Sequence, residues 1–294
     1  VTVQTVMRLI PMPPGEIKSG EIIFEGEDIV KVSDEKMRKL RGGKIGMIFQ
    51  DPMTSLNPTI KVGKQIMEGI LIHKKVSKAE AKKQAIEMLA KVGIPKPEER
   101  FEQYPHEFSG GMRQRAVIAI ALSCEPDLLI CDEPTTALDV TIQAQILELI
   151  NKLKEELNIG VILITHDLGV VAQTADRVVV MYAGEKLEEA PVTELFKNPK
   201  HPYTWGLLKS LPRLDMSSNE KLSSIPGTPP DLLKPPAGDP FAPRSEYAMK
   251  IDYERKPPMI DLGNGHIVKS WLYVKGAPEV KSPFENDNGD GKEK

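Results

Sequence analysis

The sequence has few cysteines and lacks long apolar runs. Only Cys124 and Cys131 occur among its 294 residues, and neither lies in a spacing typical of a metal site. We interpret both as buried, reduced thiols of a cytosolic protein. Since no apolar run approaches the roughly 18 to 20 residues of a membrane-spanning helix, we expect any membrane contact to be made through another protein.

The sequence also lacks a large excess of positive or negative charge. The chain carries 39 basic and 42 acidic residues, for a formal net charge of −3. This balance gives no global field that would attract nucleic acid, so we expect no nucleic-acid partner. A hydrophobic content of 40% is ample for a core, and the length suits one large domain or one domain with an extension.

The clearest sign of chemistry is a short apolar run that ends in two carboxylates. Residues 128–131 show no polar alternation, which predicts a strand buried on both faces of a parallel sheet. Asp132 and Glu133 follow directly, at the strand end where such sheets bind ligands. One carboxylate can hold Mg²⁺ while the other aligns or deprotonates a water that attacks a γ-phosphate. The alternative for this pattern alone is a strand that ends in a solvated acidic turn.

A candidate phosphate cradle precedes this strand. Ser109, Gly110 and Gly111 open a predicted helix that the Ser109 side chain can cap. Glycines let backbone N–H groups approach an anion closely, and a helix start adds unpaired donors and roughly half a positive charge. The alternative is a plain capped helix with a flexible entry, and only the combination with the two carboxylates makes the pattern specific.

These two segments carry a family resemblance. SGGMRQR, followed about twenty residues later by CDEPTTALD, resembles the signature motif, Walker B motif and D-loop of ABC-type ATPases. The run at 112–115, where most of that superfamily has Gln directly after Gly-Gly, resembles the ATP-binding subunits of dipeptide and oligopeptide transporters. The resemblance implies an α/β fold: a RecA-like P-loop core with a parallel sheet and a small antiparallel β layer, an α-helical subdomain and a Pro-rich C-terminal extension.

The resemblance also implies a set of site residues for ATP and Mg²⁺. It assigns catalysis to Glu133 and His166, ATP contacts to Gln50, Ser109, Gly110, Gly111, Asp132 and Asp139, and Mg²⁺ to Gln50 and Asp132. In the family, the signature loop moves toward the ATP of a second subunit. We therefore assign Ser109, Gly110 and Gly111 to the nucleotide of a partner subunit.

Two of these assignments depend on context. A glutamine before Asp-Pro is usually a turn cap, but IFQDPMTSLNP resembles the family's Q-loop, whose Gln50 would sense Mg²⁺ and the attacking water. The residues after it contact the membrane subunits in relatives. A histidine after a buried strand is usually a structural cap, but His166 resembles the switch histidine that contacts the γ-phosphate. It follows a predicted strand at 161–165, so we expect it at the same crevice as Asp132 and Glu133.

The chain divides by composition and resemblance. We predict a nucleotide-binding domain at 1–197 with a helical subdomain at about 56–122, an extension at 198–276 and a disordered polar tail at 277–294. Of 25 prolines, 13 lie between 191 and 258, so the extension is expected to be dominated by loops.

Local patterns predict the elements within these divisions. They predict a helix at 1–10, short antiparallel strands at 16–30, a helix opened by a capping box at 77–80 and ending at Gly93, a helix at 142–157 and a strand at 177–182.

The phosphate loop GxxxxGK[ST] of the family does not occur in these 294 residues. In relatives that loop grips the β- and γ-phosphates and directly precedes a helix like the one predicted at 1–10. We therefore expect the sequence to be a portion of a longer protein that begins after this loop, and this chain alone to be inactive. The alternative is a genuinely degenerate subunit.

The extension, which begins near His201-Pro202-Tyr203, resembles one found on peptide-transporter ATPases. In many relatives four cysteines in this extension hold an iron–sulfur cluster, and the matching positions here are Asp239, Ser245, Asp252 and Ser270. Because none is a thiolate, we expect no such cluster. Either the extension is stabilised by other means, or the sequence was altered at those sites. A hard-metal site at Asp239 and Asp252 is a further alternative.

The resemblance implies an ATP-hydrolysing energy-coupling subunit for import of dipeptides or oligopeptides, on the cytoplasmic face of the cell membrane. Its partners would be a second ABC ATPase subunit, identical or homologous, transmembrane permease subunits and, indirectly, an extracytoplasmic peptide-binding protein. One alternative is a catalytically impaired regulatory or structural subunit. Another is a DNA-maintenance ATPase with the same motifs, but Gln50 and Ser109 are only 59 positions apart, which leaves no room for the long coiled coil of that class.

Overall fold

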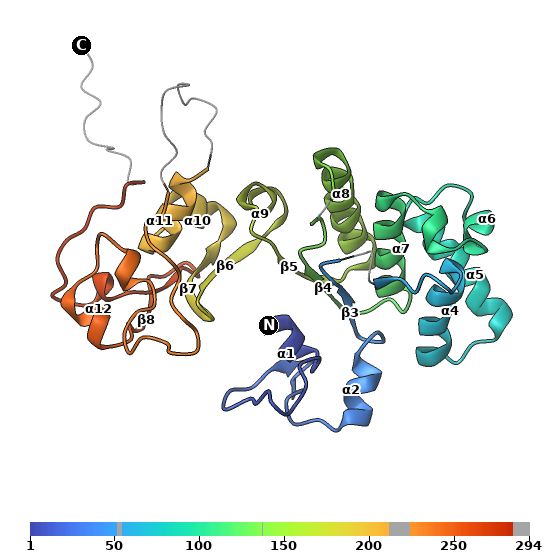
Figure 1. The fold of residues 1–294 in the computed structure, drawn as a ribbon, viewed down its shortest axis with the longest axis horizontal. Coiled ribbons are helices and arrows are strands. Elements are labelled where there is room, and N and C mark those ends of the chain that lie inside the picture. The colour runs from blue at the N-terminus through green and yellow to red at the C-terminus, as the bar shows by residue number, and fades with distance from the viewer. Residues whose placement is uncertain (52–54, 137, 212–223, 285–294) are drawn as a thin grey trace, which may run out of the picture. The chain divides into compact units, whose positions relative to one another are not determined.

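The computed structural model describes residues 1–51, 55–136, 138–211 and 224–284 (Figure 1). The chain forms two compact units, which we call unit 1 (Val1–His166) and unit 2 (Asp167–Lys294). Among the described residues, no helix combines the length and the apolar character that crossing a bilayer requires.

A parallel sheet forms the centre of unit 1. Its strands are β3 (Ile45–Ile48), β4 (Leu128–Asp132) and β5 (Gly160–Ile164), in the order β3-β4-β5. Ile45 lies opposite Leu128 and Leu128 opposite Gly160, so the carboxyl ends of the three strands meet at one edge. This edge positions the candidate site.

Strand β4 is buried on both faces, as its apolar run predicts. Leu129 and Cys131 pack into a large core shared with the surrounding helices. Ile130, which points to the other face, packs with Val3 and Ile45 in a second cluster. Strand β5 differs from the prediction of a buried strand, because the Ile162 side chain is 42% exposed. Within the described part of unit 1, β5 is the last strand of the sheet and has a neighbour on one side only.

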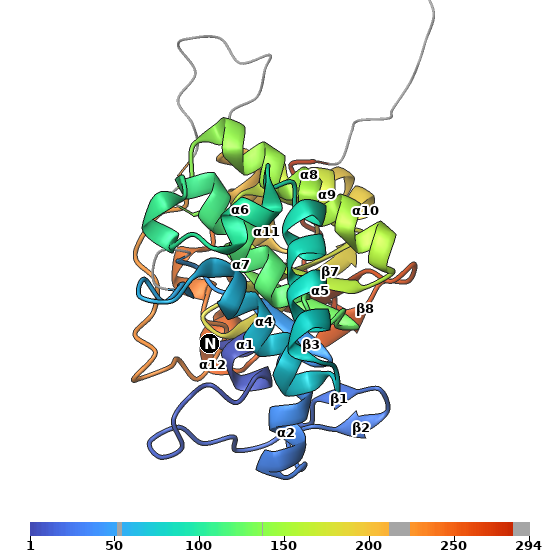
Figure 2. The same ribbon diagram turned by 90° about the vertical axis from the view of Figure 1, so that its right-hand side faces the viewer.

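A helical lobe connects β3 to β4. It comprises α4 (Val62–His73), α5 (Lys78–Lys91), α6 (Pro97–Phe101), η1 (Pro105–Glu107) and α7 (Gly110–Leu122). Figure 2 shows these helices grouped together, and their apolar faces join the same core as Leu129. Ser77 caps α5 as predicted, but the capping box is only half formed. The Glu80 carboxylate accepts a hydrogen bond from the Gln84 side chain instead of reaching back to Ser77.

The N-terminal segment forms shorter elements than predicted. Helix α1 (Thr2–Val6) ends well before residue 10, because Arg8 adopts a left-handed backbone with φ 47°. The Arg8 guanidinium then donates to the carbonyls of Ile29, Val30 and Val32. The antiparallel hairpin predicted at 16–30 is present as β1 (Ile23–Phe24) and β2 (Glu27–Asp28), and α2 (Asp34–Leu40) follows it.

Helix α8 (Val140–Leu157) returns the chain from β4 to β5. It begins two residues before the predicted start at 142, because the Asp139 side chain caps it by accepting from the Ile142 amide at 3.0 Å. Its buried residues Ile146 and Leu149 face the core of unit 1.

Unit 2 is organised around an antiparallel sheet in the order β6-β7-β9-β8. Its elements are α9 (Leu168–Thr174), β6 (Arg177–Tyr182), β7 (Glu185–Pro191), α10 (Val192–Lys197), α11 (Pro202–Lys209), η2 (Ala242–Arg244), α12 (Lys250–Glu254), β8 (Met259–Asp261), β9 (Ile267–Lys269) and η3 (Trp271–Tyr273). Because β7 pairs with β9 at Glu188 opposite Val268, the chain near residue 190 and the predicted extension share one sheet. The predicted boundary near residue 197 therefore falls inside unit 2, and most of the predicted tail, 285–294, lies outside the described residues.

A fully buried carboxylate joins three segments of unit 2. Glu188 on β7 accepts from the amides of Lys200 and His201 at 2.6 and 3.0 Å, and it lies 2.7 Å from Nε2 of the buried His266. Next to it, burial lowers the pKa of His201 to about 4, so the ring is neutral and its Nδ1 accepts from the Tyr203 amide at the start of α11. The contacts of Glu188 hold α11 and β9 against β7.

Replacing this carboxylate should destabilise unit 2. Glu188→Gln turns one acceptor into a donor that faces a backbone N–H, so we expect the free energy of unfolding to fall by about 2 kcal/mol or more. Both tryptophans, Trp205 and Trp271, lie in unit 2, so tryptophan fluorescence during urea unfolding measures this effect. Glu246 is exposed and has no hydrogen bond or ion pair to another described residue, so Glu246→Gln provides the control. Equal stability of the two variants would contradict this role of Glu188.

Candidate functional site

Three side chains hold the Glu133 carboxylate just beyond the end of β4. Gln50 Nε2 and Thr136 Oγ1 donate to Oε2 at 2.9 and 3.0 Å. Nδ1 of His166 lies 3.3 Å from Oε1. Gln50 and His166 follow β3 and β5, so the chain ends of all three parallel strands converge on one carboxylate. Of the predicted residues, the structure thus brings Gln50, Glu133 and His166 together.

The electrostatics of this cluster keep Glu133 ionised. The Thr136 hydroxyl hydrogen bond lowers the pKa of Glu133, and the His166 contact and the Gln50 hydrogen bond act in the same direction against the opposing effect of burial. The Glu133 side chain is 25% exposed and the His166 ring 81% exposed. An ionised carboxylate at a solvent-accessible strand end can accept a proton from a nearby water.

The backbone at Glu133 is in an unusual conformation. Its φ is +48°, in the left-handed region that non-glycine residues rarely adopt. The Glu133 amide donates to the Ile164 carbonyl of β5 at 3.0 Å, which anchors the turn. Strained backbone of this kind concentrates at functional sites, where surrounding contacts hold it in place.

The predicted Mg²⁺ residues differ in their contacts. Asp132 at the end of β4 is partly exposed and has no hydrogen bond or ion pair from its side chain to any described residue. Gln50 uses its amide nitrogen on Glu133, and its amide oxygen is unpaired among the described residues. Both therefore have oxygens free for a metal. Within the described ranges, no three acidic, histidine or cysteine side chains are grouped to hold a metal ion by themselves.

The predicted phosphate cradle opens α7. Ser109 Oγ accepts from the Met112 amide at 3.3 Å and caps the helix. The amides of Gly110 and Gly111 have no hydrogen-bond partner among the described residues, and a side chain at Gly110 would meet open space. A Cβ at Gly111 would lie 3.1 Å from Ile142 on α8, so a larger residue there would require the Ile142 side chain to shift, whereas Gly110 has open space. Two free N–H groups at a capped helix start can receive an anion.

The D-loop residue Asp139 is not part of the Glu133 cluster. Its Oδ1 caps α8, and the residue is exposed. Ala137 of the predicted D-loop and residues 52–54 of the predicted Q-loop lie outside the described residues.

Two side chains that contact this region were not predicted. Thr136 stands three residues after Glu133, a spacing at which a hydroxyl after a turn can reach back to the carboxylate. Gln114 lies within the run SGGMRQR and donates to the carbonyl of Pro134. The sequence feature that could have indicated the role of Gln114 is a polar residue on an otherwise apolar side of α7.

In unit 2, the four residues at the cysteine positions of relatives line one small cavity. Each side chain accepts a backbone hydrogen bond: Asp239 from Phe241, Ser245 from Tyr247, Asp252 from Met249 and Ser270 from Leu272, at 2.7 to 3.2 Å. Four oxygen ligands that already cap local turns do not fit an iron–sulfur cluster, which is held by thiolates. The Phe241 amide uses Oδ1 of Asp239 and the Met249 amide uses Oδ2 of Asp252, which leaves one oxygen of each carboxylate outside these two bonds.

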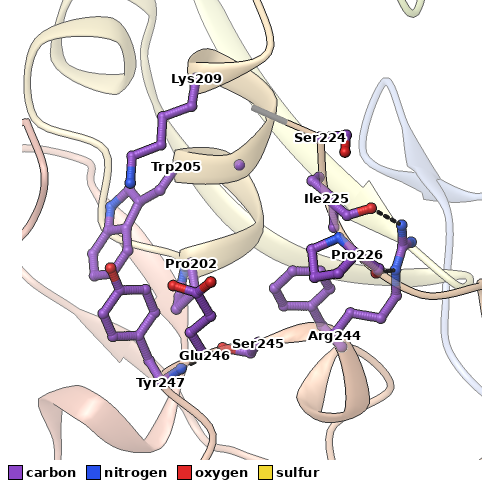
Figure 3. Close-up of a pocket in the computed structure, with 12 residues that line it drawn as sticks. Pro202, Trp205, Lys209, Ser224, Ile225, Pro226, Arg244, Ser245, Glu246 and Tyr247 are labelled. Carbon is purple, nitrogen blue, oxygen red and sulfur yellow. Dashed lines mark hydrogen bonds between the residues drawn. The ribbon is translucent and has the colours of Figure 1, made fainter. Parts of the chain in front are cut away.

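A larger cavity of about 80 Å³ lies beside the first, also within unit 2 (Figure 3). Trp205 on α11 and Tyr247 form part of its wall, with their rings edge to face at 5.0 Å. Arg244 closes another side by donating to the carbonyls of Pro226 and Ile225 at 2.7 and 3.2 Å. Ser245 lines both cavities, and no other predicted site residue lines the larger one.

The small cavity should make stability depend on pH. Burial raises the pKa of Asp239 to about 6 from 3.8, with a smaller contribution from the nearby Asp252. Since the folded-state pKa is the higher one, ionisation lowers stability as the pH rises from about 4 to about 6. Asp239→Asn keeps an oxygen for the Phe241 amide but cannot ionise. We expect it to raise the free energy of unfolding at pH 8 by on the order of 2 kcal/mol and to change it little at pH 4.

Urea unfolding followed by tryptophan fluorescence at both pH values measures this difference, with Glu246→Gln as the control for charge removal at an exposed site. An equal effect of Asp239→Asn at pH 4 and pH 8 would contradict the pKa shift.

Comparisons with known proteins identify the family and the fold. The family described as ABC transporter matches residues 5–136, and the family described as oligopeptide/dipeptide transporter, C-terminal region, matches residues 187–251. Two solved structures share the fold. The dimeric cassette MJ0796 bound to ADP and Pi is 27% identical with a TM-score of 0.55 over 65% of this chain and 80% of its own. The structure of cbiO1 from Clostridium perfringens is 30% identical with a TM-score of 0.58 over 67% of this chain and 74% of its own.

The sequence relatives are more similar still. The oligopeptide transport ATP-binding protein OppD of Bacillus subtilis is 62% identical over 96% of this chain and 79% of its own length. The dipeptide transport ATP-binding protein DppD of Lactococcus lactis is 54% identical over 97% of this chain and 81% of its own length. The predicted family and fold class are confirmed, and this chain belongs to the ATP-binding proteins of oligopeptide and dipeptide ABC transporters.

Proposed function

We propose that this protein hydrolyses ATP to drive the import of dipeptides or oligopeptides through separate membrane subunits. The observation that supports this most is the Glu133 carboxylate, held ionised by Thr136, Gln50 and His166 at the carboxyl ends of three parallel strands. The names of the relatives, which are transport ATP-binding proteins for oligopeptides and dipeptides, supply the substrate class.

In the proposed reaction Glu133 is the general base. Its ionised carboxylate accepts a proton from the water that attacks the γ-phosphate. The hydrogen bonds of Gln50 and Thr136 to Oε2 orient the carboxylate, which leaves Oε1 as the proton acceptor on the side of His166. The nitrogen of the exposed His166 ring that does not face Glu133 is left to contact the γ-phosphate. Asp132 and Gln50 would hold Mg²⁺, which neutralises charge on the phosphates.

The second half of each site comes from a partner subunit. The free amides of Gly110 and Gly111, with Ser109, lie at the start of α7, whereas Glu133 follows β4. We assign the α7 start to the nucleotide of the partner, so that two subunits enclose two ATP molecules, with Asp139 contributing at the interface between them. The partner is a second copy or a homologous subunit. Both would sit on the cytoplasmic face of the membrane, against the permease subunits, and an extracytoplasmic protein would deliver the peptide.

Glu133→Gln should slow turnover strongly and preserve ATP binding. The amide keeps the shape of the side chain but cannot accept a proton, so we expect the ATPase rate of the full-length protein to fall by on the order of 10² to 10⁴. Phosphate release and nucleotide binding are measured side by side, with Glu148→Gln on the exposed face of α8 as the control. A full-length protein that binds no ATP would instead favour the regulatory alternative, and an active Glu133→Gln variant would exclude Glu133 as the base.

If the signature loop binds the partner's nucleotide, a negative charge at Gly110 should weaken ATP-dependent dimerisation. In the Glu133→Gln background, ATP should stabilise a dimer with the partner ATPase subunit, detected by light scattering. Adding Gly110→Asp places a negative charge at an exposed site near the expected phosphates, and we expect it to prevent this dimer while leaving ATP binding to the monomer intact. Gly110→Ala adds a small neutral group in open space and should keep the dimer. Equal dimerisation of the Asp and Ala variants would argue against the assignment.

A further inference from the structure

Gln114 on α7 is an unusual residue for its place. It is fully buried, on the side of the helix that carries the buried Val117, Ile118 and Ala121. Its Nε2 donates to the Pro134 carbonyl at 2.5 Å, across 20 positions of sequence. Its Oε1 is buried and has no hydrogen-bond partner in the described part of the chain. A buried amide with one end unpaired costs stability that an apolar side chain of the same size would not.

The bond of Gln114 ends next to the proposed catalytic base. Pro134 directly follows Glu133, whose backbone is left-handed and whose amide is bound to β5. The turn is therefore fixed on its two sides by different elements. The Ile164 carbonyl of β5 holds the amide of Glu133, and the Gln114 side chain of α7 holds the carbonyl of the next residue. A change at either anchor would rotate the Glu133 side chain.

The same helix begins with the signature loop. Ser109 caps α7, and Gln114 follows Gly111 within the next turn of the helix. The Gly111 backbone also packs closely against Ile142 at the start of α8, which is the far end of the loop that begins at Glu133. A displacement of the α7 start, where the partner's nucleotide would bind, is thus carried to both ends of the loop that contains Pro134, Thr136 and Asp139.

We propose that Gln114 is a positioning residue for Glu133, which transmits the placement of the signature loop to the catalytic carboxylate through the Pro134 carbonyl. This inference rests on the proposed function, since it concerns ATP hydrolysis at Glu133. It gives the buried amide a role that an apolar residue, which would pack without an unpaired oxygen, could not fill.

The test is a double-mutant cycle in the full-length protein. Gln114→Met keeps length and burial but removes the donor. We expect it to lower kcat for ATP by on the order of 10²-fold, with KM, ATP binding and ATP-dependent dimerisation unchanged. In the Glu133→Gln background the same substitution should cause no further loss, because Gln114 acts only through Glu133.

The matched control is Ile118→Val, a buried change on the same helix, which should leave kcat unaltered. Circular dichroism and thermal unfolding check that each variant is folded. If Gln114→Met does not fold, Gln114→Leu serves as the second variant. An unchanged kcat, or an equal loss with and without Glu133, would overturn the inference while the proposed function stands. A wild-type protein without ATPase activity would overturn the proposed function itself.

Discussion

The hydrogen bonds to the Glu133 carboxylate are the constraint on which the site depends. They come from Gln50, Thr136 and His166, which follow different strands or lie within the same turn. Such an arrangement requires that β3, β4 and β5 run parallel and in register, so that their chain ends coincide. It also requires the left-handed backbone at Glu133, which directs the side chain back over the strand ends. The buried faces of β4 hold that geometry, because Leu129 and Cys131 pack into one core and Ile130 into another.

Much of this arrangement could be predicted from the sequence. The unbroken apolar run before Asp132 predicted a strand buried on both faces, and the glycines after Ser109 predicted the capped start of α7. The family resemblance then placed Gln50 and His166 near the carboxylates. The contacts of Thr136 and Gln114 could not be predicted in this way, because they depend on the turn after β4. No periodicity encodes a positive φ at a glutamate, and that torsion decides which carbonyl and which hydroxyl meet their partners.

Long-range contacts also explain where the predictions failed. Helix α1 is short because Arg8 binds carbonyls that lie 21 to 24 positions away, which outweighs the local helical pattern. Strand β5 is more exposed than its composition suggests because its position in the sheet, not its sequence, sets its burial. In unit 2, the Pro-rich composition predicted loops correctly between 224 and 241. It gave no sign that β9 pairs with β7 or that Glu188 joins β7, α11 and His266.

The proposed mechanism requires that one ATP lies between Glu133 of one subunit and the Gly110 and Gly111 amides of another. The most direct measurement is a structure of the full-length Glu133→Gln protein with its partner subunit, ATP and Mg²⁺. We expect residue 133 and the γ-phosphate to be bridged by one water, Asp132 and Gln50 to face Mg²⁺, and the partner's α7 start to contact the same γ-phosphate. A nucleotide bound with the γ-phosphate remote from residue 133, or contacted by one subunit alone, would contradict the account.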